Sequence, residues 1–322
     1  MQYGSIPGIE KPVSRLVQGT LMINDANGTP GFALLDGVLA MGCNTFDTAR
    51  VYGGGKNEGV VGQWVRERGV RDQVVIIGKG AHPEGEQKRV TPADINADVQ
   101  TSLREFKFDY IDFYLLHRDD ESQPVGPIIE TLNEHLKAGR INAFGGSNWT
   151  PERIQAANEY AFAHNLTPFV ASSPNFSLAE QVKEPWPGCV SISGPQNEAA
   201  RAWYQAEKMP LFTWSSLAGG FFSGRFTRDN LESFDNYFDK VCVMSYCYED
   251  NFRRLDRARQ LAEERGLSIP QVALAYIMSA PLEVYALVGC NTPDEFRANM
   301  DALDMKLDAN TMDWLDLRAD TR

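Results

Sequence analysis

The chain has 322 residues, of which 43% are apolar and 23% charged, the composition of an ordinary soluble globular enzyme. Lys and Arg total 31 and Asp and Glu total 43, so the formal charge of −12 argues against nucleic acid and anionic membranes as partners. The N-terminal segment lacks an apolar signal core, and no apolar run approaches the roughly 18 residues that span a bilayer. These features predict a cytoplasmic protein and leave its oligomeric state open.

Short apolar runs alternate with amphipathic stretches along the chain. The runs expected to form strands are residues 15–19, 44–49, 73–79, 110–117, 141–148, 169–174, 210–216 and 285–290. The stretches expected to form helices are residues 31–42, 58–69, 93–106, 126–139, 151–164, 197–208, 253–266 and 270–280. The segments TPADI, TPERI and NTPDEF are typical helix starts, and Gly69, Gly139 and Gly266 stand where helices are expected to end.

Eight strand–helix units predict a parallel sheet with right-handed crossovers, and eight is the number that closes a (β/α)₈ TIM barrel. The alternative is an open doubly wound sheet. It usually has a GxGxxG fingerprint after its first strand, and LVQGTLMIN has none. We therefore predict one barrel domain over residues 1–322. Two long loops, 182–197 and 218–252, are expected over its carboxyl-end active site.

Four polar residues lie at or just past the ends of separate apolar runs. Asp47, Lys79 and His117 lie at three strand ends, and Tyr52 lies in the loop after Asp47. The carboxyl ends of barrel strands meet at the active site. A carboxylate, a phenol, an ammonium and an imidazole are suited to moving a proton to or from a carbonyl or alcohol oxygen. The alternatives are a purely structural Asp47–Lys79 ion pair, a core histidine and a surface tyrosine.

These motifs resemble those of the aldo-keto reductase family. FDTA followed by Tyr52, the strand-ending Lys79, and His117 in LLHRDD are similar in order and context to the family's Asp-Tyr-Lys-His tetrad. GSNW at 146–149, TWSSLAGGFFSGRF at 213–226 and VGCNTPDEFRANM at 288–300 are similar to its segments after strands five, seven and eight. The likeness covers nearly the whole chain.

The resemblance implies an NAD(P)H-dependent carbonyl reductase or alcohol dehydrogenase. Tyr52 is expected to donate the proton, with a pKa that Lys79 lowers, while Asp47 keeps Lys79 charged and His117 orients the substrate oxygen. NADP(H) is the expected cofactor and NAD(H) the alternative, because Asn291 is neutral where many NADPH-dependent relatives have Arg or Lys. The expected substrate is a small carbonyl or alcohol, with a sugar or sugar derivative as the favoured class. No metal is expected.

The resemblance also implies a set of cofactor-binding residues. Ser147 and Asn148 are expected to hold the nicotinamide carboxamide, Trp214 to stack on the nicotinamide ring, and Arg225 to pair with phosphate. Ser173 is a departure, since many relatives have Gln there. The full expected set is Gly19, Thr20, Asp47, Ser147, Asn148, Ser173, Trp214, Ser215, Leu217, Gly219, Arg225, Gly289, Asn291, Thr292, Glu295 and Asn299.

Two other functions are alternatives to the reductase. One is a cofactor-binding redox sensor or regulatory subunit, which could keep the tetrad. The other is a Schiff-base aldolase with Lys79 as its nucleophile, although Asp47 argues for a charged Lys79.

The chain has further aromatic and imidazole side chains outside the tetrad. The histidines outside the tetrad, His82, His135 and His164, are expected on loops or polar helix faces without a role. The candidate walls of the substrate site are Trp149, Trp186, Phe222, Phe238 and Tyr246.

Overall fold

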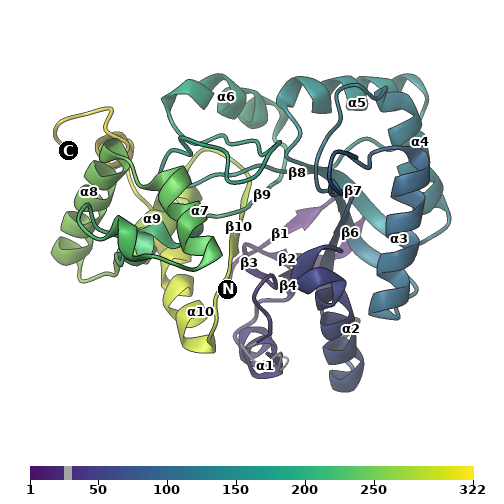
Figure 1. Cartoon of the computed structure of the whole chain (residues 1–322), viewed down its shortest axis with the longest axis horizontal. Helices are drawn as coiled ribbons and strands as arrows, with labels where there is room; N and C mark the ends of the chain where they lie inside the picture. The colour runs from purple at the N-terminus through teal and green to yellow at the C-terminus, as the bar shows by residue number, and fades with distance from the viewer. Residues whose placement is uncertain (25–30) are drawn as a thin grey trace. The chain divides into compact units, whose positions relative to one another are not determined.

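A computed structural model describes residues 1–24 and 31–322 (Figure 1). Strands β1 (Tyr3–Ile6) and β2 (Ile9–Ser14) form an antiparallel pair. The remaining strands close a barrel in the order β10-β3-β4-β5-β6-β7-β8-β9, and the paired strands within it run parallel. These strands are β3 (Leu16–Gly19), β4 (Thr45–Asp47), β5 (Val75–Gly80), β6 (Ile111–Leu116), β7 (Ile141–Ser147), β8 (Ser172–Ser173), β9 (Leu211–Thr213) and β10 (Val284–Val288). The predicted (β/α)₈ barrel is confirmed.

Helices follow the barrel strands as the alternating pattern predicted. They are α1 (Phe32–Ala40), α2 (Asn57–Arg68), α3 (Pro92–Phe106), α4 (Val125–Lys137), α5 (Pro151–Ala163), α6 (Glu198–Glu207), α7 (Tyr237–Tyr246), α8 (Glu249–Arg265), α9 (Ile269–Ser279), α10 (Pro293–Met300) and α11 (Ala309–Leu315). The predicted capping signals at Thr91, Thr150, Gly69 and Gly266 are confirmed. The hydroxyls of Thr91 and Thr150 accept hydrogen bonds from the first turns of α3 and α5. Gly69 and Gly266 end α2 and α8 in the left-handed conformation.

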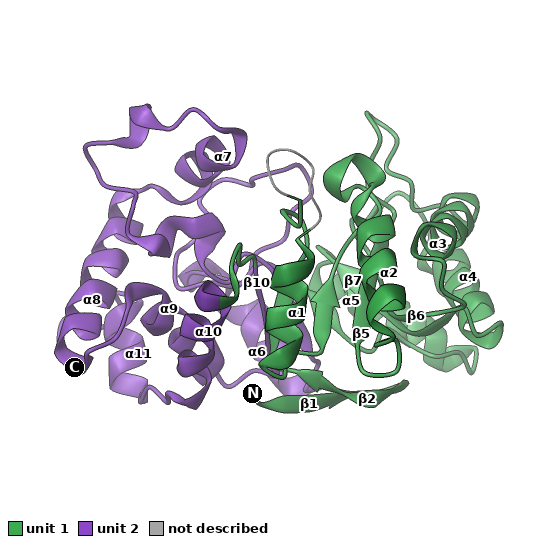
Figure 2. Cartoon of the chain, turned by 90° about the horizontal axis from the view of Figure 1, so that it is seen from below, with its two compact units in different colours: residues 1–173, 289–293 green, residues 174–288, 294–322 purple. Residues whose placement is uncertain are grey.

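The chain forms two compact units, which Figure 2 colours separately. Unit 1 comprises residues 1–173 and 289–293, and unit 2 comprises residues 174–288 and 294–322. Unit 1 contains β1–β8 and α1–α5, and unit 2 contains β9, β10, α6–α9, α11 and nearly all of α10. That the whole chain is one domain stays a prediction.

Continuous apolar runs build the core of unit 1. Every residue of β4, β5 and β6 is buried, as expected for parallel strands covered on both faces. Helix α3 packs against β5 and α4 against β7, and Figure 1 shows these helices outside the strands of unit 1. Burying a charged side chain among apolar neighbours costs free energy unless an opposite charge or a hydrogen bond compensates it. Asp47 and Lys79 therefore need polar partners inside the barrel wall.

The β1–β2 hairpin, which the sequence analysis did not predict, covers the amino ends of strands in unit 1. The backbone N–H of Ser14 donates to the side-chain oxygens of Asn44 and Thr45, both at 3.1 Å. Lys11 Nζ donates to the carbonyl of Val74 at 2.7 Å and pairs with Asp112 at 2.7 Å. With this end covered, the carboxyl ends of the unit 1 strands are the ones left for a site.

The expectation of one long loop over residues 218–252 is wrong. The segment contains α7 and the start of α8. The Asn236 side chain caps α7 by accepting from the N–H of Asp239 at 2.9 Å, a local signal that the aromatic-rich composition obscured. Phe222 and Tyr246 are almost fully buried, so they are core residues of unit 2 rather than pocket walls. Segment 182–197 is irregular except for an isolated parallel bridge from Ser191 to Asn175 and a 3₁₀ turn at Pro195–Asn197.

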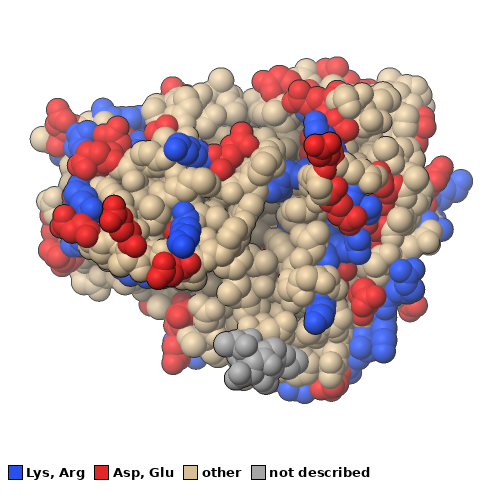
Figure 3. Space-filling view, in the orientation of Figure 1, with Lys and Arg blue, Asp and Glu red and all other residues tan. Residues whose placement is uncertain are grey.

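The surface is mixed in charge on the face drawn in Figure 3, where acidic and basic side chains are interspersed. None of the described helices combines the length and apolar character needed to cross a membrane. Within residues 1–24 and 31–322, no group of His, Cys, Asp and Glu has the arrangement of a metal site. The five cysteines are thiols and form no disulfide.

Candidate active site

Three neighbouring strands and one turn bring the four predicted catalytic residues together in unit 1. Asp47 ends β4, Lys79 lies one residue before the end of β5, and His117 follows β6 directly. Tyr52 opens the 3₁₀ turn Tyr52–Gly55 after β4. The parallel register pairs Asp47 with Ile77 and Lys79 with Leu115, so the side chains gather at the carboxyl ends of the strands.

The Lys79 ammonium forms a buried ion pair with Asp47. Nζ donates to the Asp47 carboxylate and, at 2.7 Å, to the carbonyl of Thr48. The side chains of Lys79 and Asp47 are only 4% and 5% exposed. Burial acts to lower the pKa of Lys79, but Asp47 and the Tyr52 hydroxyl outweigh it and raise that pKa. Lys79 is therefore charged at neutral pH, which does not suit the nucleophile of a Schiff-base aldolase.

The phenol of Tyr52 lies beside this ammonium. Lys79 Nζ is 5.1 Å from the centroid of the Tyr52 ring. Burial raises the pKa of Tyr52, and the Lys79 charge and hydrogen bond oppose that rise. The predicted effect of Lys79, a lowering of the pKa of Tyr52, is present, but burial has the larger effect and the net direction is upward. The reason is that the loss of water around the phenolate outweighs a single nearby cation.

His117 completes the set as a neutral imidazole. Its ring lies edge to face with Tyr52, with centroids 5.9 Å apart. Burial and the charges of Lys79 and Arg118 hold the pKa of His117 well below its usual value. Its carbonyl accepts from Arg118 Nη1 at 2.8 Å and Asn148 Nδ2 at 3.1 Å, which fixes the residue in place. Nδ1 of His117 is buried and has no hydrogen-bond partner among the described residues.

His82 lies at the same site, although the sequence analysis gave it no role. Its ring is edge to face with His117, with centroids 4.9 Å apart. His82 Nδ1 lies 2.9 Å from the carbonyl of Pro83, and because a carbonyl only accepts, Nδ1 carries the proton and Nε2 is an acceptor. Burial lowers the pKa of His82. The available signal was its position three residues after Lys79, just beyond the same strand end.

Of the other expectations about aromatic and imidazole residues, one is confirmed and two are wrong. His164 is exposed as predicted, but His135 is fully buried on the apolar face of α4, where Nδ1 accepts from Arg140 at 3.0 Å. Trp149 is also fully buried, and its Nε1 donates to the carbonyl of Arg118 at 3.2 Å. Trp149 therefore supports the loop after His117 and is not a pocket wall.

The cofactor candidates of unit 1 lie mainly at strand ends. Ser147, Asn148 and Ser173 are buried where β7 and β8 end. Ser147 Oγ donates to the Ser173 carbonyl at 3.0 Å. Gly19 ends β3, and the Thr20 hydroxyl donates to the Asp47 carbonyl at 3.0 Å.

Two features of these strand ends fit a bound amide-bearing ring. Ser173 Oγ and Gln18 Oε1 are buried and without a hydrogen-bond partner in the described part of the chain. Buried polar atoms normally have partners, so both atoms have capacity for a ligand. A Cβ added at Gly289 would meet open space, and Asn291 and Thr292 beside it are exposed. The residues present therefore fit a nicotinamide dinucleotide.

The cofactor candidates of unit 2 lie after β9 and on α10. Trp214, Ser215 and Leu217 are partly exposed, and Gly219 is exposed in the left-handed conformation with φ 62°. On α10, Glu295 is exposed and Asn299 is buried.

Arg225, the expected phosphate partner in unit 2, already pairs with Asp239 through two hydrogen bonds, one of them 2.8 Å long. Its guanidinium is thus partly engaged within its own unit. Phosphate binding by Arg225 stays a prediction.

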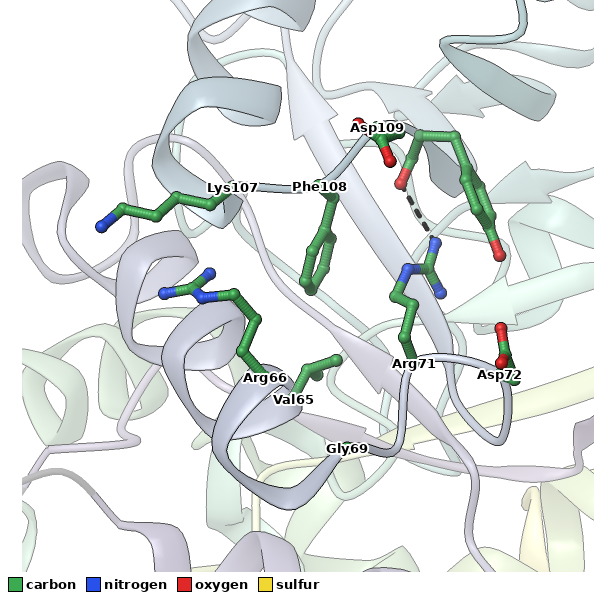
Figure 4. Close-up of a pocket in the computed structure, with 9 residues that line it drawn as sticks. Val65, Arg66, Gly69, Arg71, Asp72, Lys107, Phe108 and Asp109 are labelled. Carbon is green, nitrogen blue, oxygen red and sulfur yellow. Dashed lines mark hydrogen bonds between the residues drawn. The ribbon is translucent and has the colours of Figure 1, made fainter.

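A separate surface hollow of about 280 Å³ lies where α2 and α3 end (Figure 4). It contains three basic side chains, but two of them are engaged. Arg71 donates to the carbonyl of Tyr110 at 3.0 Å and pairs with Asp112 at 2.8 Å, and Arg66 donates to the carbonyl of Phe106. Arg66 satisfies the free carbonyl of the last residue of α3, and Arg71 satisfies the carbonyl just before β6, so these two cations have a structural explanation.

Comparisons with known proteins identify the family of the chain. The model of the Aldo/keto reductase family matches residues 15–317. The chain is 28% identical to the aldo-keto reductase YhdN of Bacillus subtilis, over 92% of this chain and 87% of that protein. It is 26% identical to a probable voltage-gated potassium channel subunit beta of Oryza sativa subsp. japonica, over 95% and 92%. It is 25% identical to the probable aryl-alcohol dehydrogenase AAD4 of Saccharomyces cerevisiae, over 90% and 88%.

Among solved structures, the thermostable aldo-keto reductase Tm1743, crystallised with the inhibitor epalrestat, has a similar fold. The TM-score is 0.73 at 19% sequence identity, and the match covers 99% of this chain and 100% of the other. At this identity the likeness supports the fold alone.

Proposed function

Because the chain belongs to the Aldo/keto reductase family, we propose that Asp47, Tyr52, Lys79 and His117 catalyse reversible hydride and proton transfer between a nicotinamide cofactor and a carbonyl or alcohol. The family generally uses NAD(P)H, and the chain is an NAD(P)-dependent oxidoreductase of carbonyl or alcohol groups. The observation that carries the proposal is the buried Lys79 ammonium, held by Asp47 at 4–5% exposure and lying 5.1 Å from the Tyr52 ring.

Each tetrad residue has a role that follows from its surroundings. When bound, a nicotinamide dinucleotide supplies the hydride for the carbonyl carbon or accepts it from the alcohol. In the reducing direction Tyr52 donates its hydroxyl proton to the substrate oxygen, and Lys79 stabilises the phenolate that remains. Asp47 fixes the position and charge of Lys79. The neutral imidazole of His117 can donate a hydrogen bond to the same oxygen and orient it.

For the cofactor we propose NADP(H), held in unit 1 by three groups of residues. Ser147, Asn148 and Ser173 are assigned to the carboxamide, because they offer buried donors and acceptors at adjoining strand ends. Gly19 and Thr20 are assigned to the face of the ring, and Gly289, Asn291 and Thr292 to the adenosine end. The candidates of unit 2, from Trp214 to Arg225 with Glu295 and Asn299, stay predictions from the sequence.

Calorimetric titration with NADPH and NADH tests the cofactor assignment. We expect NADPH to bind at least about tenfold more tightly, which corresponds to roughly 1.4 kcal/mol. Equal affinities would refute the NADP(H) preference and leave the reductase proposal standing, whereas failure to bind either dinucleotide would count against both.

For the substrate we propose a carbonyl compound with a neighbouring hydroxyl, such as a sugar or sugar derivative. His82 supports this choice. Its Nε2 is a neutral acceptor beside His117, so a hydroxyl next to the reacting carbonyl can donate to it. A site built to accept from a hydroxyl discriminates strongly against a substrate that lacks one.

Replacing His82 with Phe tests this substrate class, since Phe keeps an aromatic ring against His117 and removes the acceptor. We expect kcat/KM for a 2-hydroxyaldehyde to fall about tenfold or more, and kcat/KM for the matching aldehyde without the hydroxyl to change less than about threefold. The two substrates are compared in the same steady-state assay. Equal losses for both would remove His82 from substrate selection.

A second candidate function is a regulatory subunit that binds the cofactor. Its support is that two of the related proteins, from Oryza sativa subsp. japonica and Arabidopsis thaliana, are named probable voltage-gated potassium channel subunits beta. Steady-state turnover with a broad panel of carbonyl compounds separates the two. Tight NADPH binding without turnover would favour the regulatory function.

A further inference from the structure

Asp98 on α3 is a buried carboxylate outside the tetrad. It is 2% exposed, and its helix packs against β5. One oxygen, Oδ1, pairs with Arg50 Nε at 2.8 Å and with the guanidinium of Arg89. The other, Oδ2, accepts a hydrogen bond from the backbone N–H of Ala81 at 2.8 Å. Three partners therefore share one buried carboxylate.

Two of these partners belong to the segments that carry the catalytic phenol and ammonium. Arg50 is two residues before Tyr52, and Ala81 is two residues after Lys79. The N–H of Arg50 also donates to the carbonyl of Lys79 at 3.0 Å, so the two segments already adjoin there. Asp98 thus contacts the Tyr52 segment through a side chain and the Lys79 segment through the backbone.

The backbone at the carboxyl end of β5, which carries Lys79, is tightly constrained where it meets Asp98. Ala81 has φ 55°, a left-handed conformation that L-residues rarely adopt without compensating contacts. A Cβ added at Gly80 would lie 2.7 Å from Asp98 Cβ and 2.0 Å from the Tyr114 hydroxyl. The Asp98 carboxylate and the close approach of α3 together hold this strand end.

We propose that Asp98 is a positioning residue that sets the distance between the Lys79 ammonium and the Tyr52 phenol. The negative charge is essential because Asp98 is the buried one of the two carboxylates that the Arg50 guanidinium pairs with. The other is that of Glu84, at 3.2 Å, and the Glu84 side chain is 55% exposed. Without the charge at Asp98, Arg50 keeps only its pair with the exposed Glu84, and the Tyr52 segment loses its buried anchor beside Lys79. This inference rests on the proposed function, in which Lys79 stabilises the Tyr52 phenolate.

The chain offers a matched control in Asp112. This carboxylate is as deeply buried and has the same kinds of partners: two cations, Lys11 at 2.7 Å and Arg71 at 2.8 Å, and one backbone N–H, that of Ile76 at 3.0 Å. Ile76 lies near the start of β5, whereas Ala81 follows its end. At about 3.3 Å per residue, the two anchored backbone sites are roughly 16 Å apart.

The test compares Asp98→Asn with Asp112→Asn in the full chain. We expect both variants to unfold at lower temperature. Only Asp98→Asn is expected to lower kcat for carbonyl reduction, by about tenfold, while KM stays within about threefold of the wild-type value. In the same variant, the pH at which kcat falls on the alkaline side is expected to be higher than in the wild type. The reason is that a more distant Lys79 lowers the pKa of Tyr52 less, and one pKa unit corresponds to a tenfold change. Arg50→Gln, at a partly exposed position, provides a second variant if Asp98→Asn does not fold.

Backbone amide exchange of the cofactor-free protein adds a readout that does not depend on turnover. The amides of Arg50 and Ala81 are expected to exchange faster in Asp98→Asn, and that of Ile76 in Asp112→Asn. Indistinguishable pH profiles and kcat losses in the two aspartate variants would overturn the positioning role, as would protected Arg50 and Ala81 amides in Asp98→Asn. If the wild-type protein turned over no carbonyl, the proposed function would fail, and the exchange data would still decide whether Asp98 holds the two segments.

Discussion

Replacing Tyr52 with Phe is expected to reduce the rate of carbonyl reduction by about 100- to 10,000-fold, the range that a general acid contributes. Phe retains the ring that lies edge to face with His117 and 5.1 Å from the Lys79 ammonium, so it removes the proton donor and little else. The dissociation constant for NADPH is therefore expected to stay within about twofold. Single-turnover rates and equilibrium binding measure the two effects separately.

The outcome for Tyr52→Phe has a direct bearing on the mechanism. Turnover at the wild-type rate would show that the substrate oxygen receives its proton elsewhere. A variant that lost NADPH binding in proportion to turnover would place Tyr52 in the binding site without assigning it the proton. Circular dichroism and the melting temperature serve as controls for folding.

Replacing Lys79 with Met is the second change with a large expected effect. It removes the cation that favours the Tyr52 phenolate, so the pKa of Tyr52 rises further. In the reducing direction the protonated phenol is needed, and the alkaline limb of kcat therefore moves to higher pH. In the oxidising direction the phenolate is needed, and the residual activity requires higher pH than in the wild type. We expect kcat to fall at least about 100-fold, measured in both directions across the pH range.

Lys79→Met also leaves the Asp47 carboxylate buried without its cation, which is expected to change how the melting temperature depends on pH. Burial already raises the pKa of Asp47, and the loss of Lys79 raises it more. A carboxyl whose native pKa lies above its unfolded value binds more protons when folded, so its contribution to stability declines as pH rises above the unfolded value. Lys79→Met is therefore expected to melt at a lower temperature at about pH 7 than at about pH 5. The double variant Asp47→Asn, Lys79→Met should recover stability and remain inactive.

The gathering of the four proposed catalytic residues could be predicted from the sequence, because polar residues at strand ends interrupt a pattern of continuous apolar runs. In strands that are buried on both faces, Asp47 and Lys79 stand out as charges with no packing reason, and the parallel order of β4, β5 and β6 fixes which ends adjoin. The barrel could also be predicted from a repeated pattern. Eight strand–helix units with right-handed crossovers are compatible with few strand orders, and the closed barrel is one of them.

The residues that the sequence analysis missed depend on contacts without a local pattern. His82 meets His117 through a left-handed turn at Ala81, and nothing in the sequence GKGAH specifies that conformation. Asp98 lies on the buried face of α3 among apolar positions, and its partners Arg50 and Ala81 come from two other segments. Such convergence is determined by tertiary packing. The hairpin β1–β2 was missed because its strands, of four and six residues, carry little apolar alternation.

Transfer of an isotopic label tests the central claim most directly. The wild-type protein is incubated with a panel of carbonyl compounds and NADPH that carries deuterium at the transferable position of its nicotinamide ring, and the products are analysed by mass spectrometry. The account predicts an alcohol with one deuterium on the former carbonyl carbon, and at least about 100-fold less of it in the same time with Tyr52→Phe. An alcohol without deuterium, or no alcohol from any carbonyl despite bound NADPH, would contradict it.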